Sequence, residues 1–102
     1  MIAKNILATH PLLGDRVRLS IMGVLAANEE PVSFNDLLES LALSKGNLST
    51  HLKKLEDEKL IEVEKQFVER KPRTTYVCTP TGREALQYFL EQVQKMLLLA
   101  KK

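Results

Sequence analysis

The sequence predicts a small α+β domain that is mainly helical and carries one β-hairpin. Apolar residues recur at helical spacing through most of the chain, and the period changes to that of a strand only after Leu60. At 102 residues, with 44% hydrophobic and 27% charged residues, the chain has enough apolar side chains for one modest core. We therefore expect a single domain over residues 1–102.

Two helices are expected before residue 31. The first is a short N-terminal helix over residues 1–10, with apolar residues at helical spacing: Ile2, Ile6 and Leu7. Pro11 suits the first turn of the next helix, because its missing N–H is not needed there. The apolar stripe of that helix is Leu13, Val17, Ile21, Val24 and Leu25. Pro31 prevents any continuation.

Residues 33–60 predict two short helices joined by a turn. Ser33 is expected to cap the first helix, with Asp36 completing a capping-box-like pair. After a brief turn at Ala42-Leu43, Ser44 is expected to cap the second, which should run to about Lys59. The inward faces are Phe34, Leu37, Leu38 and Leu41 in the first, and Leu48, Leu52, Leu55 and Leu60 in the second. Such a pair is a helix-turn-helix unit.

Residues 61–79 predict a β-hairpin. Its first strand alternates apolar and polar residues, with the apolar set Ile61, Val63 and Phe67. Its second strand is expected from Thr74 to Thr79, and the polar segment 70–73 between them is expected to be the turn. Thr79-Pro80 has the residues of a helix start, so a last helix should occupy residues 80–102.

The charges are segregated, although the net charge is only +2. No acid lies between Ser40 and Leu55, and the hairpin turn adds three cations, which is the local pattern that binding to DNA phosphates requires. Asn47 is the best candidate for reading adenine, and Gly46 would let the helix start approach DNA closely. The full set of candidate DNA contacts is Lys45, Gly46, Asn47, Ser49, Thr50, Lys53, Lys54, Arg70, Lys71 and Arg73. The alternatives are a solvated helix face and a hairpin end made polar against aggregation.

The last helix carries more apolar surface than a small domain needs, which favours a homodimer. Its Leu97, Leu98 and Leu99 point in several directions, so some would be exposed in a monomer. The expected interface is Ile2, Ile6, Leu86, Phe89, Leu90, Val93, Met96, Leu97 and Ala100. The alternative is that this helix folds back on its own domain.

Other kinds of chemistry find little support. No nucleophile–base pair, carboxylate dyad or glycine-rich phosphate loop is visible, so an enzyme is not expected. His10 and His51 have no ligand spacing with Cys78, and neither metal nor cofactor is expected. The single cysteine fits a reducing, cytoplasmic setting. The N-terminus does not read as a signal peptide, and the apolar run 96–100 is too short to span a bilayer.

The segment Leu43–Glu56 resembles the recognition helix of winged-helix repressors of the MarR and ArsR types. The segments 59–61, 78–83 and 10–12 also look like those families. The resemblance implies a homodimeric transcriptional regulator with residues 1–10 and 80–102 as dimerisation helices, 33–60 as helix-turn-helix and 61–79 as wing. The family's DNA contacts would fall on Lys45, Asn47, Ser49, Thr50 and Lys53, and on Arg70, Lys71 and Arg73.

Two features depart from those families. Lys59 stands where they usually place a glycine in left-handed conformation, so it must accept that geometry at some cost or the helix must end differently. The helix around 34–41 lacks the cysteines of thiol-type metal sensors.

From the charge pattern and the resemblance together, we expect a sequence-specific regulator of double-stranded DNA, with its recognition helix in the major groove and its wing on the backbone or in the minor groove. The alternative is a winged-helix protein–protein module. The operator, the direction of regulation and any small-molecule effector stay open.

Overall fold

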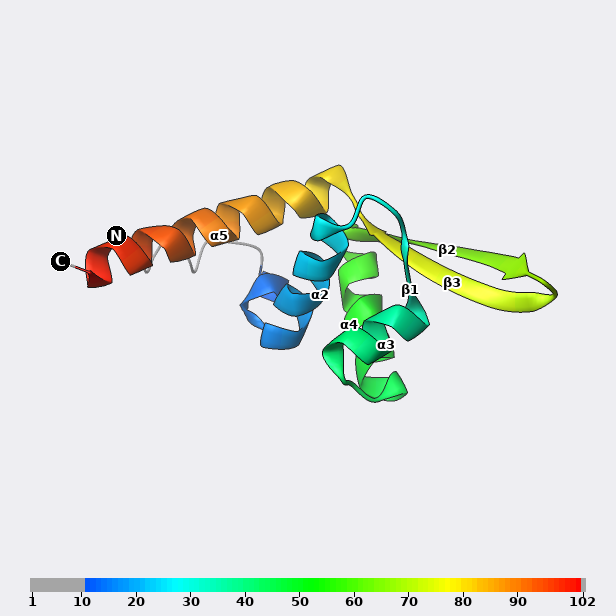
Figure 1. Ribbon diagram of the computed structural model, residues 1–102. Coiled ribbons are helices and arrows are strands. Elements are labelled where there is room, and N and C mark those ends of the chain that lie inside the picture. Colours follow the sequence, from blue (N-terminus) through cyan, green and yellow to red (C-terminus); the bar gives the residue numbers. More distant parts are fainter. Residues whose placement is uncertain (1–10, 102) are drawn as a thin grey trace.

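A computed structural model describes residues 11–101, and Figure 1 shows its elements. The elements are η1 (Pro11–Gly14), α2 (Arg16–Ala27), β1 (Val32–Ser33), α3 (Phe34–Leu41), α4 (Lys45–Asp57), β2 (Ile61–Val68), β3 (Lys71–Cys78) and α5 (Pro80–Ala100). The predicted α+β class is confirmed: helices surround the core and one hairpin projects from it. The predicted N-terminal helix lies outside the described residues.

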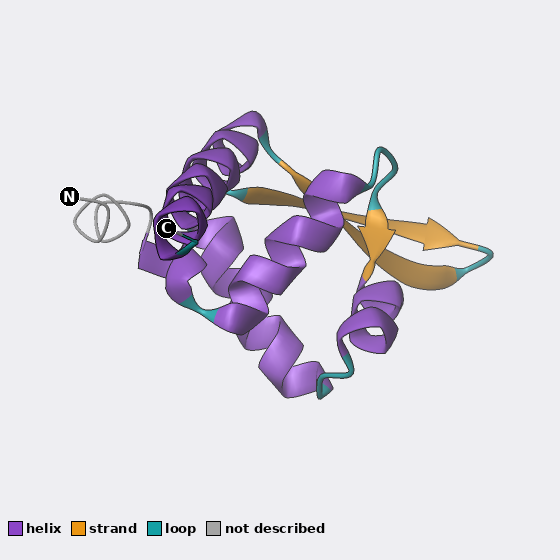
Figure 2. Cartoon of the chain, turned by 60° about the vertical axis from the view of Figure 1, so that its left-hand side comes forward, coloured by secondary structure: helices purple, strands orange, loops and turns teal. Residues whose placement is uncertain are grey.

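The sheet has three strands in the order β1-β3-β2, all antiparallel to their neighbours. The short strand β1 was not predicted, and it pairs Val32 with Tyr76 and Ser33 with Thr75. Figure 2 shows the long hairpin leaving the helical cluster beside α3. Pairing through β1 therefore fixes the base of the hairpin against the start of α3.

The core lies between α2, α3, α4 and the base of the hairpin, and the first turns of α5 close it. It is built mainly from aliphatic side chains. The buried apolar residues are Leu13, Ile21, Met22, Leu25, Val32, Leu37, Leu48, Leu52, Leu55, Leu60, Ile61, Tyr76, Leu86 and Phe89.

Side-chain caps begin each of the four α-helices. Ser33 accepts from the backbone N–H of Asp36, and Ser44 and Thr79 cap α4 and α5 in the same way, as predicted. The second predicted helix is corrected, because Pro11–Gly14 forms a separate 3₁₀ turn. Asp15 then caps α2 by accepting from the N–H groups of residues 17 and 18.

The C-terminal end of α4 takes the strained form, which is one of the two alternatives that the sequence left open. Lys59 has φ 61°, in the left-handed region where glycine is favoured. The N–H of Leu60 donates to the carbonyl of Leu55 and the N–H of Lys59 to that of Glu56, which is a Schellman motif. The helix itself ends at Asp57, slightly before the predicted Lys59.

The turn of the hairpin is tighter than predicted. Only Glu69 and Arg70 lie outside the strands, with φ 52° and 68°, so the turn has the two positive φ values of type I′. Lys71 and Arg73, expected in the turn, are paired residues of β3. Phe67, expected on a half-buried face, is 77% exposed because the hairpin extends beyond the core.

Helix α5 has 21 residues and projects past the helical cluster on the side opposite the hairpin. No helix within the described residues is long and apolar enough to cross a membrane.

Candidate nucleic-acid interface

The outer face of α4 presents the predicted recognition residues to solvent. Leu48, Leu52 and Leu55 anchor the opposite face in the core, which fixes the rotation of the helix about its axis. The exposed set is Lys45, Gly46, Asn47, Ser49, Thr50, Lys53 and Lys54. The helix is held at its start, where the N–H of Asn47 donates to Ser44 Oγ at 3.1 Å. The side chain of Asn47 stays available for an external partner.

Two of these residues already have internal partners. Thr50 Oγ1 donates to the carbonyl of Gly46 at 2.9 Å. Lys53 Nζ donates to Asp57 Oδ1 at 2.7 Å, and this hydrogen bond raises the pKa of Lys53. Because both side chains are largely exposed, water screens the pair and its exchange for a phosphate contact costs little. Lys45 and Lys54 have no such partner within the described residues.

The wing places its cations according to the strand alternation. Lys71 and Arg73 lie on one face of β3, where they pair in register with Val68 and Gln66. Arg70 stands at the turn. The three predicted wing cations are thus all exposed, but they do not share one loop.

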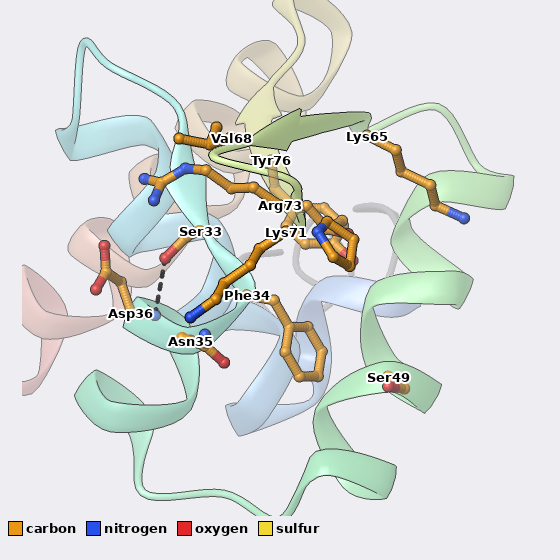
Figure 3. A pocket seen from close by; sticks show the side chains of 12 residues that line it. Ser33, Phe34, Asn35, Asp36, Ser49, Lys65, Val68, Lys71, Arg73 and Tyr76 are labelled. Atoms are coloured by element: carbon orange, nitrogen blue, oxygen red, sulfur yellow. Dashed lines mark hydrogen bonds between the residues drawn. The ribbon is translucent and has the colours of Figure 1, made fainter.

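An open groove of about 760 Å³ separates the wing from the helix-turn-helix. Figure 3 shows Lys71 and Arg73 reaching toward the start of α3, and Lys65 extending toward α4. The predicted residues Ser49, Lys71 and Arg73 therefore border one site. The lining is Ser33, Phe34, Asn35, Asp36, Ser49, Lys65, Val68, Lys71, Pro72, Arg73, Thr74 and Tyr76.

Sequence reasoning missed two polar residues of this groove, Lys65 and Asn35. Lys65 shares its strand face with Val63, so the alternation of β2 could have placed it on the inner side. Asn35 is the second residue after the Ser33 cap, in the N-terminal turn of α3, where a helix favours anions. An elongated polyanion would meet cations on the hairpin wall of the groove, and on the other wall the start of α3, where Asp36 adds one negative charge.

Arg18 joins the first helical segments to α4. Its Nη1 lies 3.2 Å from Nδ1 of His51, and its Nε donates to the carbonyl of Leu12 at 2.9 Å. Because a guanidinium only donates, Nδ1 of His51 is the acceptor. The N–H of Arg18 also donates to the carboxylate of Asp15, and this bond lowers the pKa of Asp15. His51 is therefore a packing residue at the edge of the recognition face.

Within the described residues no cluster of His, Cys, Asp and Glu has the arrangement of a metal site. Cys78 is partly buried, and this burial raises the pKa of its thiol. A raised pKa leaves less thiolate at neutral pH, which argues against a reactive sensor cysteine.

The outer side of α5 carries an apolar stripe. Leu86 and Phe89 were expected at a dimer interface, but they are buried in the chain's own core, with exposed fractions of 6% and 8%. They therefore do not belong to the exposed stripe. Ile2 and Ile6 lie outside the described residues. The exposed apolar residues of the helix are Tyr88, Leu90, Val93, Met96, Leu97, Leu98 and Leu99.

Comparison with known proteins identifies the fold. A family model described as a winged helix DNA-binding domain matches residues 17–97. The chain belongs to the winged helix DNA-binding domain family. A Methanocaldococcus jannaschii protein, MJ0432, described as uncharacterized, is 34% identical over 80 residues, which cover 78% of this chain and 86% of that protein. The family is one of DNA-binding proteins and not of enzymes.

Solved structures of regulators share the architecture. The transcriptional regulator homologue of Pyrococcus horikoshii superposes with a TM-score of 0.84 at 32% identity, covering 94% of this chain and 93% of that one. The Staphylococcus aureus MepR–DNA complex gives a TM-score of 0.73 at 20% identity, covering 88% and 76%. Bacillus subtilis PadR with operator DNA gives 0.66 at 21% identity, covering 74% and 48%. The last two similarities concern the fold.

Proposed function

We propose that this winged-helix chain is a homodimeric, MarR/ArsR-like transcriptional regulator that binds specific sequences of double-stranded DNA. In this proposal α4 enters the major groove, and the wing lies on the backbone or in the minor groove. The observation that carries it is the groove that the cationic hairpin shares with the start of α3 and with Ser49 of α4. The Pyrococcus protein described as a transcriptional regulator homologue supports it. So do the DNA complexes of MepR and PadR.

The two halves of the site would divide the work. Exposed Asn47 would read a base edge, where a bidentate contact with adenine discriminates by about 1–3 kcal/mol. Arg73 and Lys71 would contact phosphates, which positions the chain without reading sequence. The start of α4 carries no acid, so this part of the surface does not repel DNA.

The proposed dimer rests on the outer face of α5. Leu90, Val93 and Leu97 follow one another at the three- and four-residue spacings of a helix–helix seam, and each is at least 40% exposed. A second copy would cover this seam, and its two-fold axis would set two α4 helices roughly 34 Å apart, one turn of DNA. Lys71 and Arg73 lie away from this seam, so pairing leaves the DNA surface open.

The DNA proposal is tested by selecting binders from a randomised duplex pool at two salt concentrations. We expect an enriched pseudo-palindrome and an affinity that falls steeply with salt. Arg73→Ala should weaken binding to the enriched site and to other sequences by the same factor. Asn47→Ala should instead relax the preference for one base within the enriched site. Salt-sensitive binding without an enriched sequence would contradict sequence-specific recognition. No binding at low salt would leave the protein–protein module as the function to pursue.

The dimer proposal is tested by sedimentation of a matched pair of variants. Leu97→Lys introduces a charge into the seam, and Gln94→Lys introduces the same charge at an exposed polar position of the same helix. We expect Leu97→Lys to sediment as a monomer and Gln94→Lys as a dimer. A wild-type chain that remains monomeric at micromolar concentration would contradict the dimer.

We further propose a cytoplasmic location, which suits a DNA-binding regulator.

A further inference from the structure

Phe67 is an exposed aromatic side chain near the end of the wing. At 77% exposure it is the most exposed large apolar residue in the described part of the chain. Its cross-strand partner is Pro72, which is also exposed. Figure 1 shows this end of the hairpin beyond the reach of every described helix. The core therefore does not explain why an aromatic residue stands here.

The surroundings of Phe67 are cationic. Between positions 65 and 73 the chain carries Lys65, Arg70, Lys71 and Arg73, and Glu69 is the only acid. An apolar surface of a partner protein would leave these charges without counterions when it covered the ring. Duplex DNA offers both parts of the match, because the apolar faces of deoxyribose line the minor groove and phosphates border it.

The strand register shows which way the ring faces. Phe67 shares its face of the hairpin with Ile61 and Tyr76, which are buried in the core. The side of the wing that bears Phe67 is therefore the inner side, which packs on the helices at its base. The groove itself takes residues from both faces of the hairpin, with Lys65, Pro72 and Thr74 on the side of Phe67 and Val68, Lys71 and Arg73 on the other. Gln66, the residue before Phe67, lies on the opposite face, is exposed and does not line the groove.

The hairpin also holds this end in a fixed shape. Pairing continues to Val68 and Lys71, and the turn that follows has only two residues. A preorganised edge loses little conformational entropy on binding, so a small apolar contact contributes measurably to affinity.

From these observations we infer that Phe67, backed by Pro72, enters the DNA minor groove and packs against its deoxyribose walls. This inference rests on the proposed DNA-binding function, and it assigns the wing to the minor groove through an apolar contact instead of through its cations alone. Apolar side chains are used in this way by proteins that bind the minor groove. The contact would favour A·T pairs, because the N2 amino group of guanine occupies the floor of the groove at G·C pairs.

The test compares Phe67→Ala with the neighbouring control Gln66→Ala on the duplex enriched from the randomised pool. We expect Phe67→Ala to bind roughly tenfold more weakly, with an unchanged dependence of log affinity on log salt concentration, because no phosphate contact is lost. Phe67→Leu should recover part of the loss, and Gln66→Ala should stay within about twofold of wild type. Since both positions are exposed, thermal unfolding should be unaffected in each variant.

A second measurement identifies the groove. At the base pairs under the wing, A·T pairs are replaced by inosine·C, which keeps the minor-groove surface of A·T, or by G·C, which adds the amino group there. Wild type should tolerate inosine·C and weaken on G·C, and Phe67→Ala should lose this discrimination. Equal binding by Phe67→Ala and wild type overturns this inference alone, as does equal sensitivity of both to G·C. Failure of the wild-type chain to bind any duplex overturns the proposed function as well.

Discussion

Replacing Gly82 with alanine tests how α5 is joined to the recognition helix. Gly82 is buried at the start of α5, and a Cβ there would lie 2.0 Å from the carbonyl oxygen of Leu60 and 3.0 Å from Met22 Cε. The carbonyl belongs to the backbone that follows α4, so it has no rotamer with which to move away. The contact is 1.4 Å shorter than the 3.4 Å at which ordinary van der Waals contacts begin.

The cost follows from the hydrogen bonds that a shift would disturb. Thr79 N donates to the Leu60 carbonyl at 3.1 Å, and Thr79 Oγ1 donates to the Lys59 carbonyl at 2.8 Å. Overpacking costs about 1–3 kcal/mol and each weakened hydrogen bond about 1 kcal/mol, while alanine returns about 1 kcal/mol of helix propensity. We expect Gly82→Ala to lower the free energy of unfolding by about 2–4 kcal/mol, which lowers Tm by roughly 10–25 °C.

Thermal unfolding followed by circular dichroism measures this loss, at one protein concentration because a dimer's Tm depends on it. The matched control is Gly23→Ala in α2, where a Cβ would meet nothing within 4 Å. The control should gain about 0.5–1 kcal/mol from helix propensity alone. A Gly82→Ala chain as stable as wild type would refute the proposed packing of α5 on the Leu60 carbonyl.

Three more substitutions probe the recognition helix. Lys59→Gly should stabilise the chain by about 1 kcal/mol in urea unfolding, because it relieves a left-handed φ of 61°, and an unchanged midpoint would contradict that strain. Gly46→Ala should raise stability by about 0.5–1 kcal/mol, since nothing lies within 4 Å of the added Cβ, yet weaken DNA binding about tenfold by keeping α4 from the groove. If Gly46→Ala and the wild-type chain bound DNA with equal affinity, a close approach of DNA to the start of α4 at Gly46 would be ruled out. Asp57→Asn should release Lys53 for a phosphate, so that DNA affinity increases and the salt slope steepens by about 1, whereas an unchanged slope places Lys53 away from the DNA.

Local chemistry made much of the fold predictable. Ser and Thr side chains accept backbone hydrogen bonds at helix starts, so Ser33, Ser44 and Thr79 predicted the starts of three helices. The structure confirms all three. At Lys59 the sequence left open whether the residue takes a left-handed conformation or the helix ends differently, and the structure shows the left-handed conformation. The turn at Glu69-Arg70 was missed because neither residue is the Gly or Asn that usually marks a type I′ turn.

The candidate site was predictable in its residue types but not in its shape. The acid-free face of α4 follows from helical periodicity and can be read directly from the sequence. The groove itself depends on where the hairpin lies relative to α3, and β1 determines that position through two residue pairs. Lys65 and Asn35 come from elements on either side of the groove, so no local pattern connects them.

The sequence by itself therefore determined where helices begin, which faces are apolar and where cations concentrate, because these depend on neighbours along the chain. The tertiary structure decided which apolar residues are covered. In α5 the side of the helix that packs on the core includes Gln92, whose exposed fraction is 2%, and excludes Val93, whose exposed fraction is 40%. Hydropathy alone predicts the reverse. Phe67 continues an apolar alternation but lies beyond the last helix that could cover it. Burial is a property of distances between elements, which the order of residues does not contain.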